Sequence, residues 1–348
     1  MNKRPPRNGE IVQKTQNTLL VDGNALFKSS ISAAKNVYNK HGQHIGGIYA
    51  FMTTLRMLLT KDLYHRVYVF WDGNFSGKLR YEIYHPYKSG RGKDYINGNQ
   101  PKEESEVKQL KRVWDYLNEM YIRQLKNEVI EGDDFIAYYC LNKQENEKIT
   151  IASNDRDMCQ LISRDVKLYL LDKKVYVDYI NYSSYFCHHQ ENSVLLKMIT
   201  GCDADTIKGI KLLGEKTALD LFPELKERKI TLDEIIQSAT QQQKERLEAK
   251  KGPLKVLHNI INRVTDGVQG DRIYEINERL VNLKAPLMTE EGIRDLEQLI
   301  EGTLDSSGRD LKNVLVFMEK DGLKRAIGDM RYPDYLVPFK ELIHREQY

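Results

Sequence analysis

The pattern of apolar and polar positions changes along the first half of the chain. Four apolar runs of strand length, rich in β-branched and aromatic residues, each end in acidic residues, at 18–21, 67–71, 129–130 and 149–152. Two more candidate strands follow at 166–171 and 174–179. Helical patterns separate the strands at 48–59, 105–125 and 135–142. Because strand and helix alternate, we predict an α/β fold in which a parallel sheet has helices on its faces.

The second half of the chain has a more helical pattern. From about residue 193 it is typical of short helices with polar connections, at 195–200, 232–236, 254–264 and 311–327. Residues 237–251 are rich in Gln, Glu and Lys, which fits either a solvated helix or an insertion. We therefore expect an α/β core at 18–190 and a mostly helical region at 191–348. The polar, basic start at 1–17 lacks the apolar core of a signal peptide, so we expect a disordered arm there.

Charge and cysteine content narrow the function classes. The formal net charge of +3 is nearly neutral, but residues 56–93 carry eight Lys or Arg against three acids. Such a stretch indicates a surface that meets phosphate, although alone it would fit a solvated charged face. The four cysteines are scattered, which argues against a zinc site or a disulfide framework and fits a reducing cytoplasm. No apolar run approaches membrane-spanning length, so we expect a cytoplasmic protein without a membrane partner.

Acidic residues follow the end of every predicted strand in the first half of the core. They are Asp22, Asp72, Glu131, Asp133, Asp134, Asp155 and Asp157. Parallel strands end at one edge of a sheet, so these carboxylates should converge and repel one another. Bound divalent cations relieve the repulsion, and oxygen ligands alone favour Mg²⁺ or Mn²⁺. Two such ions can activate a water and stabilise the leaving oxygen of a phosphodiester.

Each acidic motif has a structural explanation when it is taken alone. An Asp-Gly pair after a strand is usually a turn, and acids at 131 and 133 favour a helix N-terminus. Asp155 and Asp157 are equally compatible with a helix cap. Four independent caps, however, need not all carry extra acids at the same sheet edge. The joint pattern therefore favours a metal site.

Three of these motifs resemble a known family. Leu-Leu-Val-Asp-Gly-Asn around Asp22, Glu-Gly-Asp-Asp at 131–134 and Ser-Asn-Asp-Arg-Asp at 153–157 resemble the 5′-nuclease superfamily. That superfamily includes flap endonucleases, the 5′-nuclease domain of bacterial DNA polymerase I, and phage ribonuclease H, to which residues 71–93 look closest. The resemblance covers about residues 18–221, with a fainter echo at 314–327. It implies a PIN-like 5′-nuclease core followed by a helical region with a DNA-binding element.

The resemblance also implies a role for each matching residue. Asp22, Asp72, Glu131 and Asp133, with Asp134 nearby, would hold one metal ion, and Asp155, Asp157 and Asp205 would hold the second. Lys88 would touch the scissile phosphate with help from Arg91, and Arg80 and Lys93 would contact DNA. Residues 88–112 would form an arch or clamp over a single strand, with further positive charge from Lys102, Lys108, Lys111 and Arg112. The glutamates at 103, 104 and 106 oppose that interpretation and leave an exposed helix as the alternative.

Residues 208–218 match the family's helix–hairpin–helix-type element. Gly209 and Gly214 would let backbone amides approach duplex phosphate, and Lys216 and Thr217 would add contacts. Family members often place a potassium ion in this loop, so K⁺ is expected here as well.

The chain departs from the family just before the hairpin element. The family usually has Gly-Asp-x-x-Asp-Asn, whereas this chain has Gly-Cys-Asp-Ala-Asp-Thr at 201–206. Cys202 thus replaces the first Asp, and Thr206 replaces the Asn. Either Asp203 compensates from the next position, or the second metal site lacks a ligand.

The expected function is that of a metal-dependent 5′-3′ exonuclease or flap endonuclease that removes RNA primers or 5′ flaps in replication. Its partners would be DNA, RNA–DNA hybrid and branched duplex, with replication proteins such as a single-strand-binding protein or clamp. No polymerase-length extension follows, so we expect a free-standing nuclease, as in phages, acting in the host cytoplasm.

Three alternatives to this function have different sequence requirements. The first is a catalytically weakened junction-binding protein of the same fold, which only Cys202 favours. An aspartyl phosphatase needs an Asp where Asn24 stands. PIN-type ribonucleases are shorter and lack the hairpin element.

Overall fold

The centre of the molecule is a six-stranded sheet with the strand order β3-β2-β1-β4-β5-β6. The computed structural model describes residues 16–91, 104–265, 272–302, 309–323, 327–328 and 330–346, so most of the arm expected at 1–17 lies outside the described residues. The strands are β1 (Gln16–Asp22), β2 (Arg66–Asp72), β3 (Arg123–Asn127), β4 (Glu147–Ser153), β5 (Val166–Leu170) and β6 (Val175–Val177). The first five are parallel, as predicted, and the α/β fold class is confirmed.

Two details of the sheet differ from the prediction. Strand β6 is antiparallel to β5, because a connection of only four residues joins them and parallel neighbours need a crossover of a dozen or more. The apolar pair 129–130 is not a strand. The strand is Arg123–Asn127, an edge strand of mostly polar residues, part of which we expected to be helical.

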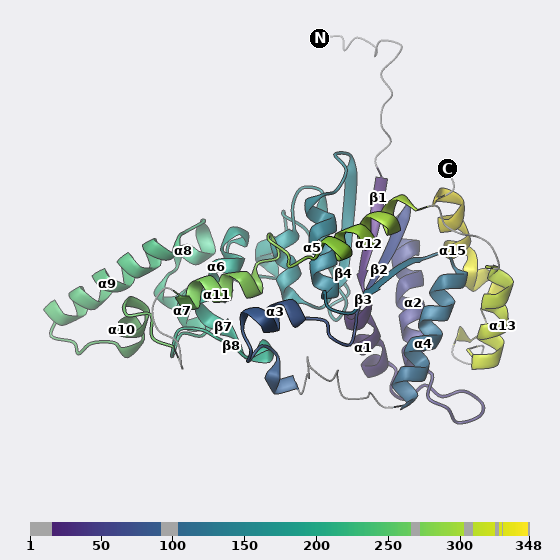
Figure 1. Ribbon diagram of the computed structural model, residues 1–348, viewed down its shortest axis with the longest axis horizontal. Coiled ribbons are helices and arrows are strands. Elements are labelled where there is room, and N and C mark those ends of the chain that lie inside the picture. The colour runs from purple at the N-terminus through teal and green to yellow at the C-terminus, as the bar shows by residue number, and fades with distance from the viewer. Residues whose placement is uncertain are drawn as a thin grey trace, which may run out of the picture.

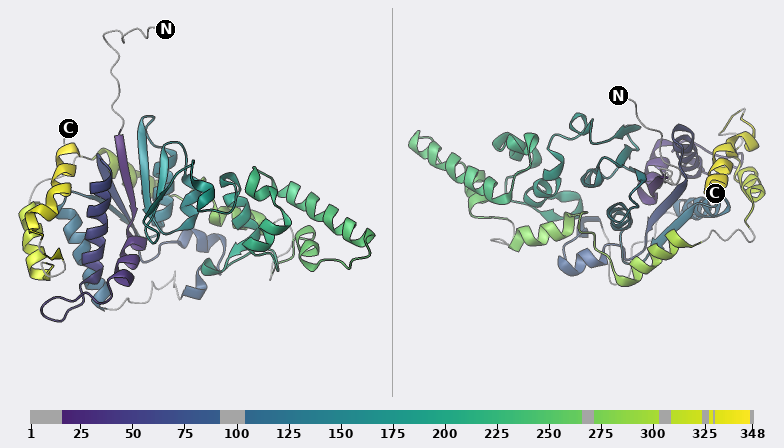
Figure 2. Two further views of the ribbon diagram at one scale, coloured as in Figure 1. Left: turned by 180° about the vertical axis from the view of Figure 1, so that it is seen from behind. Right: turned by 90° about the horizontal axis from the view of Figure 1, so that it is seen from above.

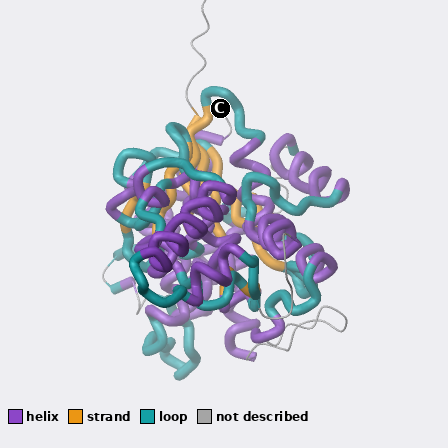
Figure 3. The backbone as a smooth tube through the Cα atoms, turned by 90° about the vertical axis from the view of Figure 1, so that its left-hand side faces the viewer, coloured by secondary structure: helices purple, strands orange, loops and turns teal. Residues whose placement is uncertain are grey.

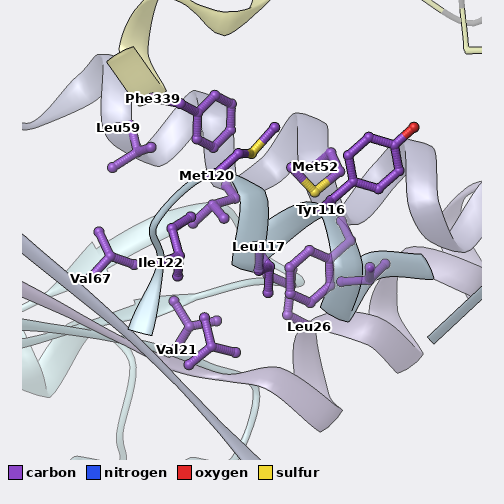
Figure 4. Packing of buried hydrophobic residues seen from close by; sticks show 14 of the residues in the cluster. Val21, Leu26, Met52, Leu59, Val67, Tyr116, Leu117, Met120, Ile122 and Phe339 are labelled. Carbon is purple, nitrogen blue, oxygen red and sulfur yellow. The ribbon is translucent and has the colours of Figure 1, made fainter. Parts of the chain in front are cut away.

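Alternating side chains bury both faces of the sheet. On β1, Leu19 and Val21 face one cluster, and Leu20 faces the other. The first face is covered by α1 (Gly23–Ala33), α2 (Gly46–Lys61) and α4 (Glu104–Glu119), and the second by α5 (Gly132–Leu141). Figure 4 shows the first cluster, with Val21 of β1 near Leu117 of α4.

A helical arm extends from one side of this core (Figures 1 and 2). The arm consists of α6 (Ser193–Thr200), α7 (Glu215–Leu221), α8 (Glu224–Glu227), α9 (Leu232–Glu248), α10 (Lys255–Ile261) and α11 (Arg272–Val281), with the short pair β7 (Gly201–Cys202) and β8 (Ile207–Lys208). These helices share an apolar cluster of their own, and α3 (Lys78–Ile83) lies against α11. Of the two alternatives for residues 237–251, the solvated helix is the one observed, because most of these residues belong to α9. A capping box between Thr231 and Glu234 begins this helix. Seen from the arm end, helices lie in front of the strands (Figure 3).

The C-terminal helices return to the core. They are α12 (Glu290–Glu301), α13 (Leu311–Asp321) and α15 (Tyr332–Glu346). Helix α12 lies against β3, while α13 and α15 lie against α4 and α2 (Figure 1). Met318 and Phe339 are buried in the first core cluster. The region expected at 191–348 thus has two parts, an arm up to α11 and a tail that completes the core.

The described helices contain no stretch that is both long and apolar enough to cross a membrane.

Candidate active site

The ends of β1 and β2 place two carboxylates side by side. Asp22 caps α1, because one oxygen accepts a hydrogen bond from the Ala25 amide at 2.8 Å. Its other oxygen accepts one from the Ser153 hydroxyl at 2.8 Å. Asp72 accepts a hydrogen bond from the Gly132 amide at 2.9 Å, which connects the end of β2 to the start of α5. Hydrogen bonds to neighbouring elements therefore fix both side chains.

The start of α5 supplies three acids with different surroundings. Glu131 and Asp133 line the same cavity as Asp22 and Asp72. Asp134 is not part of the cavity lining and is 1% exposed, with Arg80 donating to it at 2.5 and 3.0 Å. Asp134 also accepts a hydrogen bond from the Leu287 amide at 3.0 Å. The structure thus assigns Asp134 to a buried ion pair, contrary to the expectation of a metal-site residue.

Arg80 also departs from its expected role in DNA binding. Its guanidinium is buried and donates to Glu131 at 2.8 Å as well as to Asp134. Its Nε donates to the Leu280 carbonyl at 2.9 Å. Its donors therefore hold the start of α5 and the end of α11 together, and are engaged within the protein.

Lys88 contacts acids from both halves of the site. The first half consists of Asp22, Asp72, Glu131 and Asp133, and the second half of Asp155, Asp157 and Asp205. Its ammonium group forms an ion pair with Glu131, to which the Tyr87 hydroxyl also donates at 3.0 Å. Its backbone amide donates to the carbonyl of Asp205 at 2.8 Å, and its φ of 53° lies in the left-handed region. Burial lowers the pKa of Lys88, but the nearby charges of Glu131, Tyr87, Asp205 and Asp72 together raise it well above its usual value. Lys88 is thus a buried, charged ammonium group at neutral pH.

The 3₁₀ turn η2 (Arg156–Leu161), just after β4, carries the second group of acids. Asp155 accepts a hydrogen bond from the Asp157 amide at 2.8 Å, and its own amide donates to Ser153 at 3.0 Å. Asp157 forms an ion pair with Lys197 of α6. Contact with the arm therefore helps to position this half of the site.

The turn at residues 202–206 brings one more acid, Asp205, to the cavity. The 3₁₀ turn η5 (Asp203–Asp205) brings Asp205 to the cavity, while Asp203 is exposed and lies outside its lining. The Cys202 thiol donates a hydrogen bond to Asp205 at 3.2 Å. The Thr206 hydroxyl accepts a hydrogen bond from the Gly90 amide at 3.3 Å, which joins this turn to the segment that follows Lys88.

These elements enclose a single cavity of about 460 Å³. Its lining includes Asp22, Asp72, Glu131, Asp133, Asp155, Asp157, Asp205, Lys28, Arg80, Lys88 and Lys197. Burial and the nearby Asp72 raise the pKa of Asp22 to about 6, against a hydrogen bond from Ala25 that lowers it. Burial, with the charges of Asp155, Asp22 and Asp72, raises the pKa of Asp133 well above its usual value. The clustered negative charge is unfavourable and would be relieved by cations.

The donor set fits divalent metal ions of the hard class. In the described part of the chain, no three His, Cys, Asp or Glu side chains are close enough together to hold one ion as they stand. The cavity nevertheless presents carboxylate oxygens from several elements, and Mg²⁺ and Mn²⁺ prefer oxygen ligands. Lys88 and Lys197 partly neutralise the carboxylates in this arrangement. The cavity therefore has the ligand chemistry of such a metal site, but not its ligand geometry as the described side chains stand.

Comparison with known protein families identifies the family that the α/β core of the chain matches. A family model described as the 5′-3′ exonuclease, N-terminal resolvase-like domain, matches residues 17–187. Residues 17–187 of the chain therefore belong to this 5′-3′ exonuclease family. The PIN-like fold class expected from the sequence motifs is confirmed.

The chain is similar to several named 5′ nucleases. It is 28% identical over 207 residues to thermostable DNA polymerase I of Thermus caldophilus, covering 59% of this chain but only 24% of that one. It is 24% identical over 214 residues to a 5′-3′ exonuclease of Buchnera aphidicola, covering 60% of this chain and 70% of that one. Its fold is similar to a bacteriophage T5 flap endonuclease in complex with DNA and metal ions, with a TM-score of 0.58 and 19% identity over 87% of this chain and all of that one.

Two lysines that line the cavity, Lys28 and Lys197, were not predicted from the sequence. Lys197 lies on the predicted helix 195–200, five residues before Cys202, and its spacing alone gave no reason to choose it. Lys28 lies on α1, a helix that the sequence analysis did not predict. A helical period over residues 23–33 would have placed Asn24 and Lys28 on one face.

The hairpin element keeps some of its expected features. Lys216 is exposed, Thr217 is half-buried, and Gly214 is an exposed N-cap of the seven-residue α7. Gly209 has a packing role, because a Cβ there would lie 2.1 Å from the Thr200 carbonyl carbon. Two carbonyls of this loop accept hydrogen bonds, that of Gly209 from Thr265 at 2.6 Å and that of Lys211 from Asn259 at 2.8 Å.

The expected arch lies partly outside the described residues. Nothing is described for Lys93 and Lys102 or for the side chain of Arg91, whose backbone ends the 3₁₀ turn η1 (Ser89–Arg91). On α4, Lys108 pairs with Glu104 at 2.5 Å, and both side chains are exposed. Arg112 donates to Asp321 of α13 at 3.2 Å.

Proposed function

We propose that this chain is a metal-dependent 5′-3′ exonuclease and flap endonuclease. It hydrolyses phosphodiesters in DNA, or in RNA paired to DNA, at primed or branched junctions, and so removes RNA primers or 5′ flaps in replication. The observation that carries the proposal is the convergence of seven carboxylates and Lys88 on one cavity. Family membership supports the reaction class, and the DNA and metal ions bound by the T5 flap endonuclease support the ligands.

In the proposed mechanism, each half of the site would hold one metal ion. Two bound Mg²⁺ or Mn²⁺ ions would supply an activated water and stabilise the leaving oxygen. Asp22, Asp72, Glu131 and Asp133 would hold the first ion, and Asp155, Asp157 and Asp205 would hold the second. The potassium ion expected in the hairpin loop stays a prediction, because a carbonyl oxygen that accepts one hydrogen bond can still contact a cation.

Lys88 is the residue best placed to act on the scissile phosphate. Its ammonium group lies at the cavity wall beside Glu131 and is charged at neutral pH. A buried cation offsets the charge that grows on the phosphate oxygens in the transition state. If Glu131 shared its carboxylate with the metal site, its ion pair with Lys88 would weaken, and the Lys88 ammonium group could turn toward the substrate.

The substrate and its setting belong to the same proposal. The exposed Lys216 would contact duplex phosphate beyond the cavity. The duplex partners would be flapped DNA and RNA–DNA hybrid, in the cytoplasm where replication proteins such as a single-strand-binding protein or a clamp operate. The DNA polymerase I relatives support a role beside a polymerase.

A second candidate is a junction-binding protein with weak turnover. It is favoured by Cys202, which stands where the family has an acidic ligand and whose thiol donates to Asp205. Burial raises the pKa of this thiol, so it is protonated at neutral pH and is a poor ligand for a hard cation.

The deciding experiment is cleavage of 5′-labelled flapped, nicked and RNA-primed duplexes, with the products sized on a gel. We expect cleavage with Mg²⁺ or Mn²⁺ and none in excess chelator. Tight junction binding without cleavage at any metal concentration would favour the binding protein. Cleavage in excess chelator would refute the metal mechanism.

A further inference from the structure

An exposed leucine occupies a backbone conformation that leucine rarely adopts. Leu212 has a φ of 71°, in the left-handed region, and its side chain is 56% exposed. Among the non-glycine residues with positive φ in the described part of the chain, it is the only aliphatic one. The left-handed conformation is unfavourable for a residue with a Cβ, and an exposed side chain gains no core packing that would offset this cost. A single exposed leucine is ordinary on a protein surface, but one that also holds a strained backbone is not.

The strained conformation belongs to a turn that the arm holds in place. The amide of Leu213 donates to the carbonyl of Ile210 at 3.0 Å, so residues 210–213 form a β-turn with Leu212 in its third position. A positive φ at that position is the geometry of a type II turn, which favours Gly or Asn there. Ile210 and Leu213 are both buried in the apolar cluster of the arm. The turn is therefore anchored at both ends, and Leu212 stays at its exposed tip.

The backbone of Lys211, the other residue at the tip, is also held. Its amide donates to the Val264 carbonyl at 2.9 Å, and its carbonyl accepts a hydrogen bond from Asn259 at 2.8 Å. Asn259 is itself 4% exposed. A strained residue persists where its surroundings over-determine its conformation, and such residues cluster at ligand-binding sites. Leu212 is thus preorganised for contact with a partner.

The charges beside the tip indicate what the partner is. Lys208, Lys211 and Lys216 are exposed on this element, against the single acid Glu215. Positive charge of this kind suits a phosphate backbone. The tip also lies only seven positions beyond the cavity residue Asp205, which is roughly 25 Å of extended chain at most. It is therefore within the length of a short duplex that leaves the cavity.

The chemistry of a leucine restricts which part of a duplex it can contact. Phosphates suit the lysines, whereas the apolar surface between phosphates belongs to the sugars and the base edges. A deoxyribose has no 2′-hydroxyl, but a ribose presents one in the groove. Burial of that hydroxyl against an aliphatic side chain, without a hydrogen-bond partner, is unfavourable. An aliphatic contact therefore distinguishes a DNA strand from an RNA strand.

We propose that Leu212 packs against the deoxyribose surface of one strand of the duplex and makes the hairpin element selective for DNA in that strand. This inference rests on the proposed function and names the sugar that its duplex must carry. Because the proposed substrates include RNA paired to DNA, the contacted strand is the template, which is DNA in both kinds of substrate. The lysines supply salt-dependent affinity, and Leu212 supplies a contact that does not depend on salt.

The first test compares variants at the tip. Binding of flapped DNA is measured in excess chelator at several salt concentrations for the parent, Leu212→Gly and Leu212→Asn. Gly and Asn both accept a positive φ, so the Tm of each variant should be close to or above that of the parent. Affinity should fall about tenfold, as for the loss of one largely buried aliphatic side chain, with an unchanged slope of log affinity against log salt.

Two further variants serve as controls for this measurement. Lys216→Ala should reduce the salt slope by roughly one unit, the value for one phosphate contact. Leu247→Asn removes a leucine of α9 that is also 56% exposed, and it should bind as the parent does. An unchanged slope in Lys216→Ala would remove the hairpin element from the interface, and the inference with it.

The second test identifies the sugar. Short runs of ribonucleotides are placed in the template strand, in the opposite strand, or in neither, and binding is measured for the parent and Leu212→Asn. Parent affinity should fall only when the ribonucleotides are in the template strand. That loss should disappear in Leu212→Asn, because partners in contact show non-additive effects. A template-strand loss of equal size in both proteins would overturn the inference.

The two proposals fail in different ways. If the parent neither cleaves flapped DNA nor binds it more tightly than a single strand, the proposed function fails. If the parent binds and cleaves but Leu212→Gly and Leu212→Asn keep its affinity, only the role of Leu212 fails. A markedly lower Tm for both variants would show that Leu212 packs within the protein, and would also overturn the inference.

Discussion

The two halves of the carboxylate site are built in different ways. In the first half, Asp22 and Asp72 continue neighbouring parallel strands, and amides of α1 and α5 donate to them. In the second half, Asp157 and Asp205 lie on short 3₁₀ turns. Asp157 is held by Lys197 of the arm, and Asp205 by contacts to Lys88 and Cys202. The first half is thus part of the sheet, whereas the second is assembled where the core meets the arm.

This difference indicates which half tolerates change. Strand pairing fixes the first half to the register of the sheet, so a substitution there alters charge without moving the backbone. The second half depends on tertiary contacts of η2 with α6 and of the turn at 203–205 with η1, which a few side chains maintain. A chain can therefore lose an acidic ligand such as the one replaced by Cys202 and keep its fold.

The largest expected effect comes from a neutral substitution in the first half. Asp133→Asn should reduce the single-turnover cleavage rate at least about a thousandfold, since metal activation contributes several kcal/mol and each 1.4 kcal/mol or so is a factor of ten. It should raise the Tm of the metal-free protein, because Asp133 lies buried among Asp22, Asp72 and Asp155. Mg²⁺ should raise the Tm of the parent more than that of the variant.

Two measurements separate this prediction from a folding defect. Binding of flapped DNA in excess chelator should persist in Asp133→Asn, and circular dichroism should match the parent. The matched control is Asp134→Asn, which removes one charge from the adjacent position. It also deprives Arg80 of one of its two buried carboxylate partners. It should lower the Tm. A lower Tm for Asp133→Asn as well would show that the two acids are both structural.

The same contrast explains how much the sequence could predict. Asp22, Asp72 and Asp155 follow apolar strands, so their convergence could be inferred from the topology of parallel strands alone. Asp133 and Asp134 are adjacent in sequence, and only the rotation of α5 and the distant Arg80 decide which one faces the cavity. Strand β3 was misplaced because its polar edge-strand sequence lacks an apolar signal.

In the second half, side-chain contacts between distant segments were invisible to sequence patterns. Lys197 reaches Asp157 across 40 positions, and the Lys88 amide reaches Asp205 across a longer separation. The return of α13 and α15 to the core is a similar case, because amphipathic helices near a C-terminus carry no signal of the surface that they cover.

An intermediate effect is expected for Lys88, which bridges the two halves. Lys88→Ala should slow single-turnover cleavage by about a hundredfold, in the range found when one transition-state donor is removed, while the affinity for DNA changes only a few-fold. Lys78→Ala, at an exposed position on α3 outside the cavity, is the matched control and should leave both quantities unchanged. A loss of affinity with an unchanged rate would make Lys88 a phosphate anchor and nothing more.

The smallest expected effect tests whether the second half lacks a ligand. Cys202→Asp should lower the Mg²⁺ concentration for half-maximal cleavage by a few-fold, because a carboxylate supplies the charge and the hard oxygen that a thiol lacks. The structure favours this outcome over compensation by Asp203. Neither residue lines the cavity, but the Cys202 thiol is half-buried and lies 3.2 Å from the cavity residue Asp205, whereas Asp203 is exposed. Like-charge crowding with Asp205 would be offset in part by Lys197, whose charge acts on this position.

Two further variants separate charge from size and from compensation at this position. Cys202→Ser supplies a neutral oxygen of similar size and should leave the half-saturating Mg²⁺ concentration close to that of the parent. Asp203→Asn should be equally mild. The rise of Tm with Mg²⁺ gives a readout independent of cleavage, and Cys202→Asp should shift that rise to lower Mg²⁺. If Asp203→Asn instead strongly raises the half-saturating Mg²⁺ concentration while Cys202→Asp leaves it unchanged, then Asp203 turns inward when metal binds. The second half would in that case hold its full number of carboxylates through a shifted turn, and Cys202 would be a neutral replacement.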